Sequence, residues 1–283
     1  MEFVRYDINK YSPQQMVVLP LALLIIAFAI LGFTAVSTGT PLTMGIDFAG
    51  GTAVTVFTPD SREAIESHYS DYPLISVGEG ISDGKYLQFG PMSDEQFREF
   101  STLTQARYPD AKIDQIGETF GRTLQHQALL ALLFSFLGMS IVVFIAFRTA
   151  VPSFAVVFAA FSNIVITAGI MQILGIPLSL GTTAALLMLI GYSVDSDILL
   201  TSRLLKRKGK LEEKLPGAFR TGLIMTTTTL AAIAALWVVS TVGQIQIIAE
   251  IASVLFIGLG VDLMNTWLFN AGILKWYIQR GGK

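Results

Sequence analysis

Long runs without a charged residue are the feature that most constrains this chain. They lie between Lys10 and Asp47, Arg122 and Arg148, Arg148 and Asp195, and Arg220 and Glu250. Each run exceeds the roughly 20 residues that an α-helix needs to cross the hydrocarbon core of a bilayer. Only 14% of the 283 residues are charged, whereas soluble domains carry about a quarter. The sequence therefore predicts an integral membrane protein.

Six transmembrane helices are expected, and turn signals separate those that follow one another closely. We place them at residues 16–36, 123–147, 151–174, 179–202, 221–241 and 247–276. Leu174-Gly175-Ile176-Pro177 and Gly243-Gln244-Ile245-Gln246 mark two of the turns. The first apolar run is too long for the core of a signal peptide and is interpreted as a retained helix. An even number of spans puts the termini, residues 1–15 and 277–283, on one side.

The distribution of Lys and Arg predicts the orientation, because cationic residues that flank spans stay in the cytoplasm. The loop at 203–220 contains seven of them, and the short loops around Pro177 and Gln244 contain none. Residues 37–122 carry six basic and thirteen acidic residues, and a segment of this length translocates largely regardless of charge. We therefore expect a multi-pass protein of the cytoplasmic (plasma) membrane, with both termini cytoplasmic and residues 37–122 outside.

The segment 37–122 is predicted to fold as a small α+β domain. Strands are expected at 52–58, 74–79, 85–89 and 111–116, with a turn at 80–84 between the second and third strands. One helix should begin at Asp60-Ser61-Arg62-Glu63 with an acidic N-cap, and another at the capping box Ser93-x-x-Gln96. The order β-α-β-β-α-β is that of a ferredoxin-like fold.

Several classes of function find no support in the sequence. The chain has no phosphate-binding loop, no dinucleotide-binding glycine motif, no zinc-protease motif and no cysteine. The formal net charge of -2 gives no sign of nucleic-acid binding. Of the two histidines, His68 is expected to be a solvated surface residue and His126 an interfacial anchor. We therefore expect no enzyme, no cofactor and no metal site.

Acidic residues inside predicted spans are the informative ones, since a charge near the bilayer centre costs roughly 2.5 to 3.5 kcal/mol. Asp195 and Asp197 lie two residues apart, about 200° around a helix, so they cannot face the same neighbour. They lie roughly 12 and 9 Å inside Arg203. Thr226, Thr227, Thr228 and Thr229 lie about 9 to 14 Å inside Arg220. The shared depth predicts a hydrated polar layer between the fourth and fifth spans.

The roles of these residues have a structural alternative. Hydroxyl groups often only join helices, and this is the preferred interpretation of the four threonines. Buried carboxyls pair, protonate or line an ion path, which favours a proton relay through at least one of Asp195 and Asp197. Asp262, near the middle of the sixth span, fits structural pairing and a relay equally well. A cation such as Arg220 could control protonation by pairing with one of the acids.

Glycine-bearing connectors join the outer domain to the spans. The first contains Gly45, Asp47, Phe48, Gly50, Gly51 and Thr52, and the second contains Gly117 and Gly121. Glycines permit positive φ and close backbone approach. Docking of the outer domain on the membrane part is the preferred interpretation, and a pair of hinges is the functional alternative.

These segments resemble the SecF family, the smaller subunit of the SecDF protein-translocation complex. The stretch 45–52 resembles the family's Gly-x-Asp-Phe-x-Gly-Gly-Thr signature, and 116–121 resembles the segment that leads into the second helix. Gly191-Tyr192-Ser193-Val194-Asp195, followed by Arg203, is similar to the fourth-helix signature. Arg220-Thr221 and the threonines after it are similar to the start of the fifth helix. The resemblance covers nearly the whole chain.

The resemblance implies half of a resistance-nodulation-division-type transporter, which SecD completes, acting in protein export driven by the proton-motive force. Its expected partners are SecD, the Sec translocation channel, the translocating polypeptide and membrane lipid. Many bacterial members read Asn-Asp-Thr where this chain has Asp195-Ser196-Asp197, so an archaeal type is implied. Asp195 matches the family position best and ranks before Asp197 as proton carrier. The alternatives are a proton-coupled small-molecule exporter subunit and a scaffold whose acids seat a partner's helices.

Overall fold

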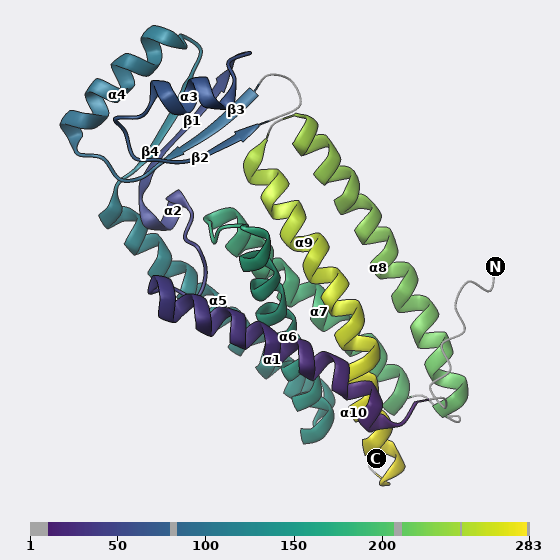
Figure 1. Ribbon diagram of the computed structural model, residues 1–283. Coiled ribbons are helices and arrows are strands. Elements are labelled where there is room, and N and C mark those ends of the chain that lie inside the picture. The colour runs from purple at the N-terminus through teal and green to yellow at the C-terminus, as the bar shows by residue number, and fades with distance from the viewer. Residues whose placement is uncertain (1–10, 80–83, 207–210, 244, 282–283) are drawn as a thin grey trace.

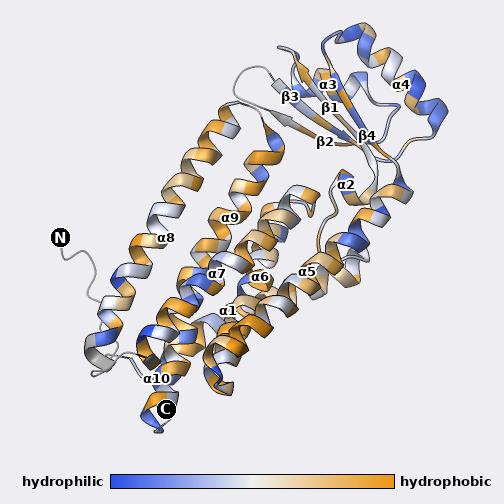
Figure 2. Ribbon diagram, turned by 180° about the vertical axis from the view of Figure 1, so that it is seen from behind, coloured by the Kyte–Doolittle hydropathy of each residue, from blue (hydrophilic) through white to orange (hydrophobic). Residues whose placement is uncertain are grey.

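A computed structural model describes residues 11–79, 84–206, 211–243 and 245–281. A bundle of long helices carries a small α+β domain at one end (Figure 1). Within the described residues, six helices are long and apolar enough to cross a membrane. Apolar residues cover most of their length, while hydrophilic residues gather on the α+β domain and at the opposite end of the bundle (Figure 2). The predicted fold class is confirmed.

The spans are continuous helices except for the sixth. The first five are α1 (Pro13–Thr38), α5 (Glu118–Phe147), α6 (Ala150–Leu174), α7 (Leu180–Lys206) and α8 (Leu211–Val242). The sixth consists of α9 (Gln246–Met264), the π-helical segment η2 (Asn265–Asn270) and α10 (Ala271–Gln279). A π-helical segment contains one more residue per hydrogen-bonded turn than an α-helix, so it changes which residues face a neighbouring helix.

Two spans begin earlier than the sequence suggested. Helix α8 starts at Leu211, although the predicted loop extends to residue 220. Leu215 and Ala218 are fully buried in a cluster with Leu200 and Leu204 of α7, and Nη1 of Arg203 donates to the carbonyl oxygen of Gly217 at 2.7 Å. An apolar helix face therefore lies within the basic segment, which the charge count alone does not reveal. Residues 207–210 lie outside the described part of the loop. Helix α5 likewise begins at Glu118.

The helices of the bundle differ greatly in how far they are buried. Within an apolar stretch of 18 residues in α6, 67% is buried inside the protein, whereas the corresponding share in α5 is 6%. Helices α6, α7 and α9 pack on one another at the centre, while α8 packs on α7 and α9, and α5 packs on α6 and α7. The predicted intramembrane acids lie on α7 and α9, so the central helices carry the site.

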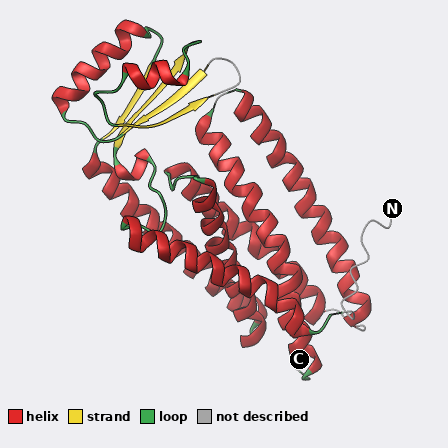
Figure 3. Cartoon of the chain, in the orientation of Figure 1, coloured by secondary structure: helices red, strands yellow, loops and turns green. Residues whose placement is uncertain are grey.

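The outer domain has the predicted order of elements. It contains β1 (Gly51–Phe57), α3 (Arg62–His68), β2 (Leu74–Glu79), β3 (Gly84–Phe89), α4 (Asp94–Arg107) and β4 (Lys112–Ile116). The antiparallel sheet has the strand order β2-β3-β1-β4, as in ferredoxin-like folds. Helices α3 and α4 lie on one face of the sheet (Figure 3). The predicted turn at 80–84 falls almost entirely outside the described residues.

Local caps explain where the two domain helices begin. The expected capping box is present at Ser93 and Gln96. At α3 the N-cap is Ser61, whose Oγ accepts from the backbone nitrogen of Ala64 at 3.3 Å. The expectation of an acidic N-cap at Asp60 was therefore wrong, because the carboxyl of Asp60 binds other partners in the domain.

The first and last helices meet at the end of the bundle opposite the sheet. Nζ of Lys275 in α10 donates to the carbonyl oxygen of Tyr11 at 2.8 Å. A Cβ on Gly272 would lie 3.2 Å from the carbonyl oxygen of Pro13, so α1 and α10 are in close contact. The described ends of the chain therefore share one side of the bundle.

Candidate functional site

Two acidic residues are fully buried between the central helices. Asp197 of α7 is 0% exposed and Asp262 of α9 is 1% exposed. Four further polar residues from α6 and the sixth span are also buried with them: Asn163, Asn265, Thr266 and Asn270. Buried charges and amides are tolerated only when hydrogen bonds or protons compensate them, so their partners define the chemistry of this site.

Asp262 accepts hydrogen bonds from three helices or segments. Nδ2 of Asn163 in α6 donates to its Oδ1 at 2.8 Å, and the hydroxyl of Ser196 in α7 donates to its Oδ2 at 2.8 Å. The hydroxyl of Thr266 in η2 lies 3.5 Å from its Oδ1. Several donors stabilise the charged form of a carboxyl. The surroundings of Asp262 therefore suit a carboxylate.

Asp197 has a much poorer set of donors. Nδ2 of Asn270, at the end of η2, donates to its Oδ1 at 2.8 Å. Its Oδ2 is buried and has no hydrogen-bond partner among the described residues. Oδ1 of Asn270 is also buried without a hydrogen-bond partner among the described residues. The same is true of the hydroxyl of Thr201, which lies one turn beyond Asp197 on α7. The two carboxyls therefore differ sharply in environment, although both belong to one polar cluster.

The predicted polar layer between the fourth and fifth spans is wrong for these acids. Asp197 binds the sixth span, because α9 and η2 pack directly on α7. The hydroxyls of Thr227, Thr228 and Thr229 in α8 donate to carbonyl oxygens of their own helix. Thr226 is buried and Arg220 is exposed. The preferred structural interpretation suits the three self-bonded threonines.

Asp195 lies on the outer surface of α7. It is exposed, as are Gly191 and Tyr192 on the preceding turn. It makes no hydrogen bond or ion pair with the residues that the structure describes. The expectation that Asp195 and Asp197 face different neighbours is confirmed, since one points away from the bundle and the other into it.

Sequence reasoning missed the buried amides Asn163 and Asn270. Nδ2 of Asn163 also donates to the hydroxyl of Ser193 at 2.7 Å, and its Oδ1 accepts from Asn265. These side chains connect α6 to α7 and to the sixth span. An uncharged amide in an apolar run is itself costly in a bilayer and could have been selected on that ground.

A second group of contacts fixes the connector after α1 to the outer end of α7. Oδ2 of Asp47 accepts from the backbone nitrogen of Leu180 at 2.9 Å, which caps α7 from outside. The backbone nitrogen of Gly45 donates to the carbonyl oxygen of Leu178, and that of Leu178 donates to Thr43, each at 2.8 Å. The family-like signature therefore binds the helix that carries Asp195 and Asp197.

Three connector glycines are required by close backbone approach. A Cβ on Gly50, at φ +79°, would lie 2.8 Å from Cα of Glu118, and one on Gly121 would lie 2.8 Å from the carbonyl oxygen of Phe48. A Cβ on Gly51 would collide with the carbonyl oxygen of Phe89. Gly117, by contrast, has nothing within 4 Å of a Cβ. The geometry supports docking as the first role of this connector, and its role as a hinge stays a prediction.

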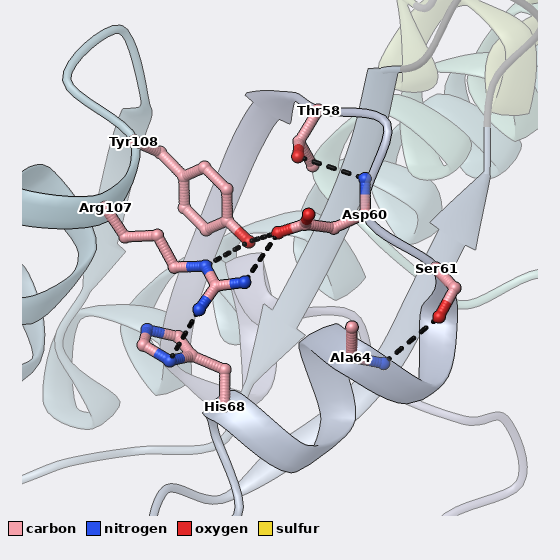
Figure 4. Close-up of polar contacts among 7 residues, drawn as sticks. All are labelled: Thr58, Asp60, Ser61, Ala64, His68, Arg107 and Tyr108. Atoms are coloured by element: carbon pink, nitrogen blue, oxygen red, sulfur yellow. Dashed lines mark hydrogen bonds and ion pairs between the residues drawn. The ribbon is translucent and has the colours of Figure 1, made fainter.

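A polar cluster on the outer domain joins the ends of β1, α3 and α4 (Figure 4). Oδ2 of Asp60 accepts from Nη2 of Arg107 at 2.8 Å and from the hydroxyl of Tyr108 at 2.7 Å. Nη1 of Arg107 lies 3.4 Å from Nδ1 of His68. The hydrogen bonds from Arg107 and Tyr108 lower the pKa of Asp60, while burial and then Arg107 lower the pKa of His68. His68 is partly buried, so the expectation of a solvated residue was wrong.

This cluster predicts that acid destabilises the outer domain in two stages. The folded-state pKa of His68 lies below its ordinary 6.5, so the unfolded chain binds a proton first and stability falls as the pH drops below 6.5. The pKa of Asp60 lies below its ordinary 3.8, so its contribution is lost as the pH falls from 3.8 through the folded value. Hydrogen exchange of β1 and α4 amides in the full chain would measure both stages. His68→Gln should remove the first stage only, and an unchanged profile in that variant would contradict the assignment.

The chain is similar to known protein-export membrane proteins over nearly its whole length. The family model described as "Protein export membrane protein SecD/SecF, C-terminal" matches residues 96–280. The chain is 59% identical to the protein-export membrane protein SecF of Methanolacinia petrolearia over 98% of both chains. It is 41% identical to SecF of Haloferax volcanii, over 97% of this chain and 96% of the relative. A crystal structure of SecDF, a translocon-associated membrane protein from Thermus thermophilus, shares the fold with a TM-score of 0.74 and 23% identity.

Six spans around a buried acid and amide cluster, with one ferredoxin-like domain on the connector between the first two spans, define a multi-pass membrane protein of the SecD and SecF type. The SecDF match covers 98% of this chain but only 40% of that chain. The chain belongs to the SecF family of protein-export membrane proteins. Members of this family are not enzymes.

Proposed function

We propose that the chain is the SecF subunit of a complex with SecD, which assists protein translocation across the cytoplasmic membrane with the proton-motive force. Family membership supports the role in export. The chain spans 40% of the matched SecDF chain, which supports a partner that supplies the remainder of that fold. The Sec channel, the translocating polypeptide and membrane lipid are the further expected contacts.

One observation carries the proposed partnership, namely an exposed stripe on the outside of α7 that includes a carboxyl. Met188, Tyr192 and Asp195 follow one another at spacings of four and three residues, and all three are exposed. This spacing places them on one helix face. A carboxyl facing lipid costs roughly 2.5 to 3.5 kcal/mol on insertion scales. Helices of SecD that cover this stripe would remove that cost.

Disulfide cross-linking tests the arrangement, since the chain has no cysteine of its own. We expect Met188→Cys and Tyr192→Cys to cross-link to cysteines placed along the fourth span of SecD in native membranes. Phe134→Cys on α5, which is 66% exposed, is the matched control and should not. Cross-links from Phe134 or from α1 alone, or failure of SecD to co-purify, would contradict the proposal.

The distribution of Lys and Arg supports one orientation of the bundle in the membrane. The end of the bundle away from the sheet carries Arg203, Lys214, Arg220, Lys275 and Arg280. Positive residues near short loops are retained in the cytoplasm. We infer that both termini are cytoplasmic and that the α+β domain faces outward, where it can meet a translocating polypeptide.

The proton relay involves all three acids in this proposal. Asp195 lies at the surface assigned to SecD, while Asp197 and Asp262 form the buried part. Because Asp195 and Asp197 lie on opposite faces of α7, a small rotation of this helix would move the two acids in opposite directions relative to the partner.

A further inference from the structure

The contact between Asp197 and Asn270 is incomplete in a way that indicates a missing hydrogen. Nδ2 of Asn270 donates to Oδ1 of Asp197 at 2.8 Å. The remaining oxygen of each group, Oδ2 of Asp197 and Oδ1 of Asn270, has no partner among the described residues, and both residues are 0% exposed. Two acceptor atoms cannot bond to each other. A proton on Oδ2 of Asp197 turns that oxygen into a donor, and Oδ1 of Asn270 is a buried acceptor without a partner on the side chain that already bonds to this acid.

The charges around Asp197 favour a proton there and not on Asp262. Asp262 is the other ionisable group that acts on Asp197 among the described residues, and it already accepts from Asn163, Ser196 and Thr266. No ion pair of the described residues includes Asp197. A second unpaired negative charge beside Asp262 would cost several kcal/mol in a dry interior. The acid with more hydrogen-bond donors keeps its charge, and the other acid takes the proton.

The π-helical segment η2 determines where Asn270 points. It inserts one residue relative to an α-helix, which rotates everything beyond it by about 100°. Asn270 is the last residue of η2, so it reaches Asp197 because of this insertion. If the segment relaxed to α-helix, Asn270 would rotate away and Asp197 would lose its amide partner. Single π-helical turns of this kind occur frequently at functional sites.

We propose that Asn270 is the positioning residue for a proton carried on Asp197, and that the π-helical turn presents its amide to the acid. This inference rests on the proposed proton relay and deepens it. Asp197 then takes precedence over Asp195 as the carrier, and Asp195 serves at the surface.

Infrared spectroscopy of the full chain in lipid nanodiscs tests the pair directly. The wild-type protein should show the carbonyl stretching band of a protonated carboxyl near neutral pH, and Asp197→Asn should abolish it. Asn270→Leu should keep the band but shift it upward, because the acid loses its amide acceptor. The double exchange Asp197→Asn with Asn270→Asp rebuilds the pair in reverse and should restore the band close to its original position. Asn265→Ser, which removes another buried amide from the same turn, is the control and should leave it unshifted.

The readout separates this inference from the proposed function. A band that survives Asp197→Asn, a wild-type protein without the band, or a band abolished by added Na⁺ would overturn the acid and amide pair. The double exchange also guards against a variant that simply fails to fold, because it keeps both side-chain shapes. Stimulation of export by the proton-motive force is measured separately. Its absence in the wild-type complex would contradict the proposed function and leave the spectroscopic result standing.

Discussion

Asp262→Leu should destabilise the protein more than any other single change in the membrane region. The substitution keeps the approximate shape but leaves the donors of Asn163, Ser196 and Thr266 buried without their acceptor. Removal of one partner from a buried charged network costs about 3 to 5 kcal/mol. Thermal unfolding of the purified protein and its level in the membrane would both show the loss.

Asp195→Leu is the matched control for this prediction. It removes a carboxyl of the same kind from an exposed position on α7, so the subunit alone should keep its unfolding temperature. Asp262→Asn should have an intermediate effect, because the amide oxygen still accepts from Asn163. Equal stability of Asp262→Leu and Asp195→Leu would mean that the network contributes nothing to folding.

Asp47→Ala should uncouple the outer domain from the helix that carries the acids. Its carboxyl is bonded to the first described turn of α7, and loss of a cap of this kind costs about 1 kcal/mol, which leaves the protein folded. We expect export stimulated by the proton-motive force to fall severalfold while protein level and binding to SecD persist. Spin labels on α4 and α7 should report a broader distance distribution in the variant.

Glu99→Ala is the control for Asp47, since it removes an exposed carboxyl from α4 of the same domain. It should leave both export and the distance distribution unchanged. Asp47→Asn keeps an oxygen that can accept from Leu180 and should retain part of the coupling. Full export in Asp47→Ala would show that the cap has no part in transmission.

The architecture could be predicted from the sequence because its causes are local along the chain. Gaps between charges indicate the spans, and the switch between a two-residue and a helical period indicates the outer domain. The start of α8 could not be predicted in this way. Leu215 and Ala218 are apolar residues within a basic segment, and only their packing on α7 shows that the helix continues through it.

The partners of the buried acids depend on packing between helices that are distant in sequence. The two-residue spacing was available, and it correctly placed Asp195 and Asp197 on different faces of one helix. Depth alone could not show that Asp197 faces the sixth span, since α8 carries threonines at a similar level. The π-helical turn gives no recognisable sequence signal, and without it the position of Asn270 relative to Asp197 cannot be derived.

The network that encloses the acids also has an order of synthesis. Asn163 and Asp197 leave the ribosome well before their partners, since Asp262 follows Asn163 by 99 residues and Asn270 follows Asp197 by 73. Until the sixth span is inserted, α6 and α7 present unsatisfied amide and carboxyl groups inside the membrane. A nascent chain that stalls in this interval differs chemically from the finished protein. The sixth span therefore supplies the hydrogen-bond partners that α6 and α7 lack until it is inserted.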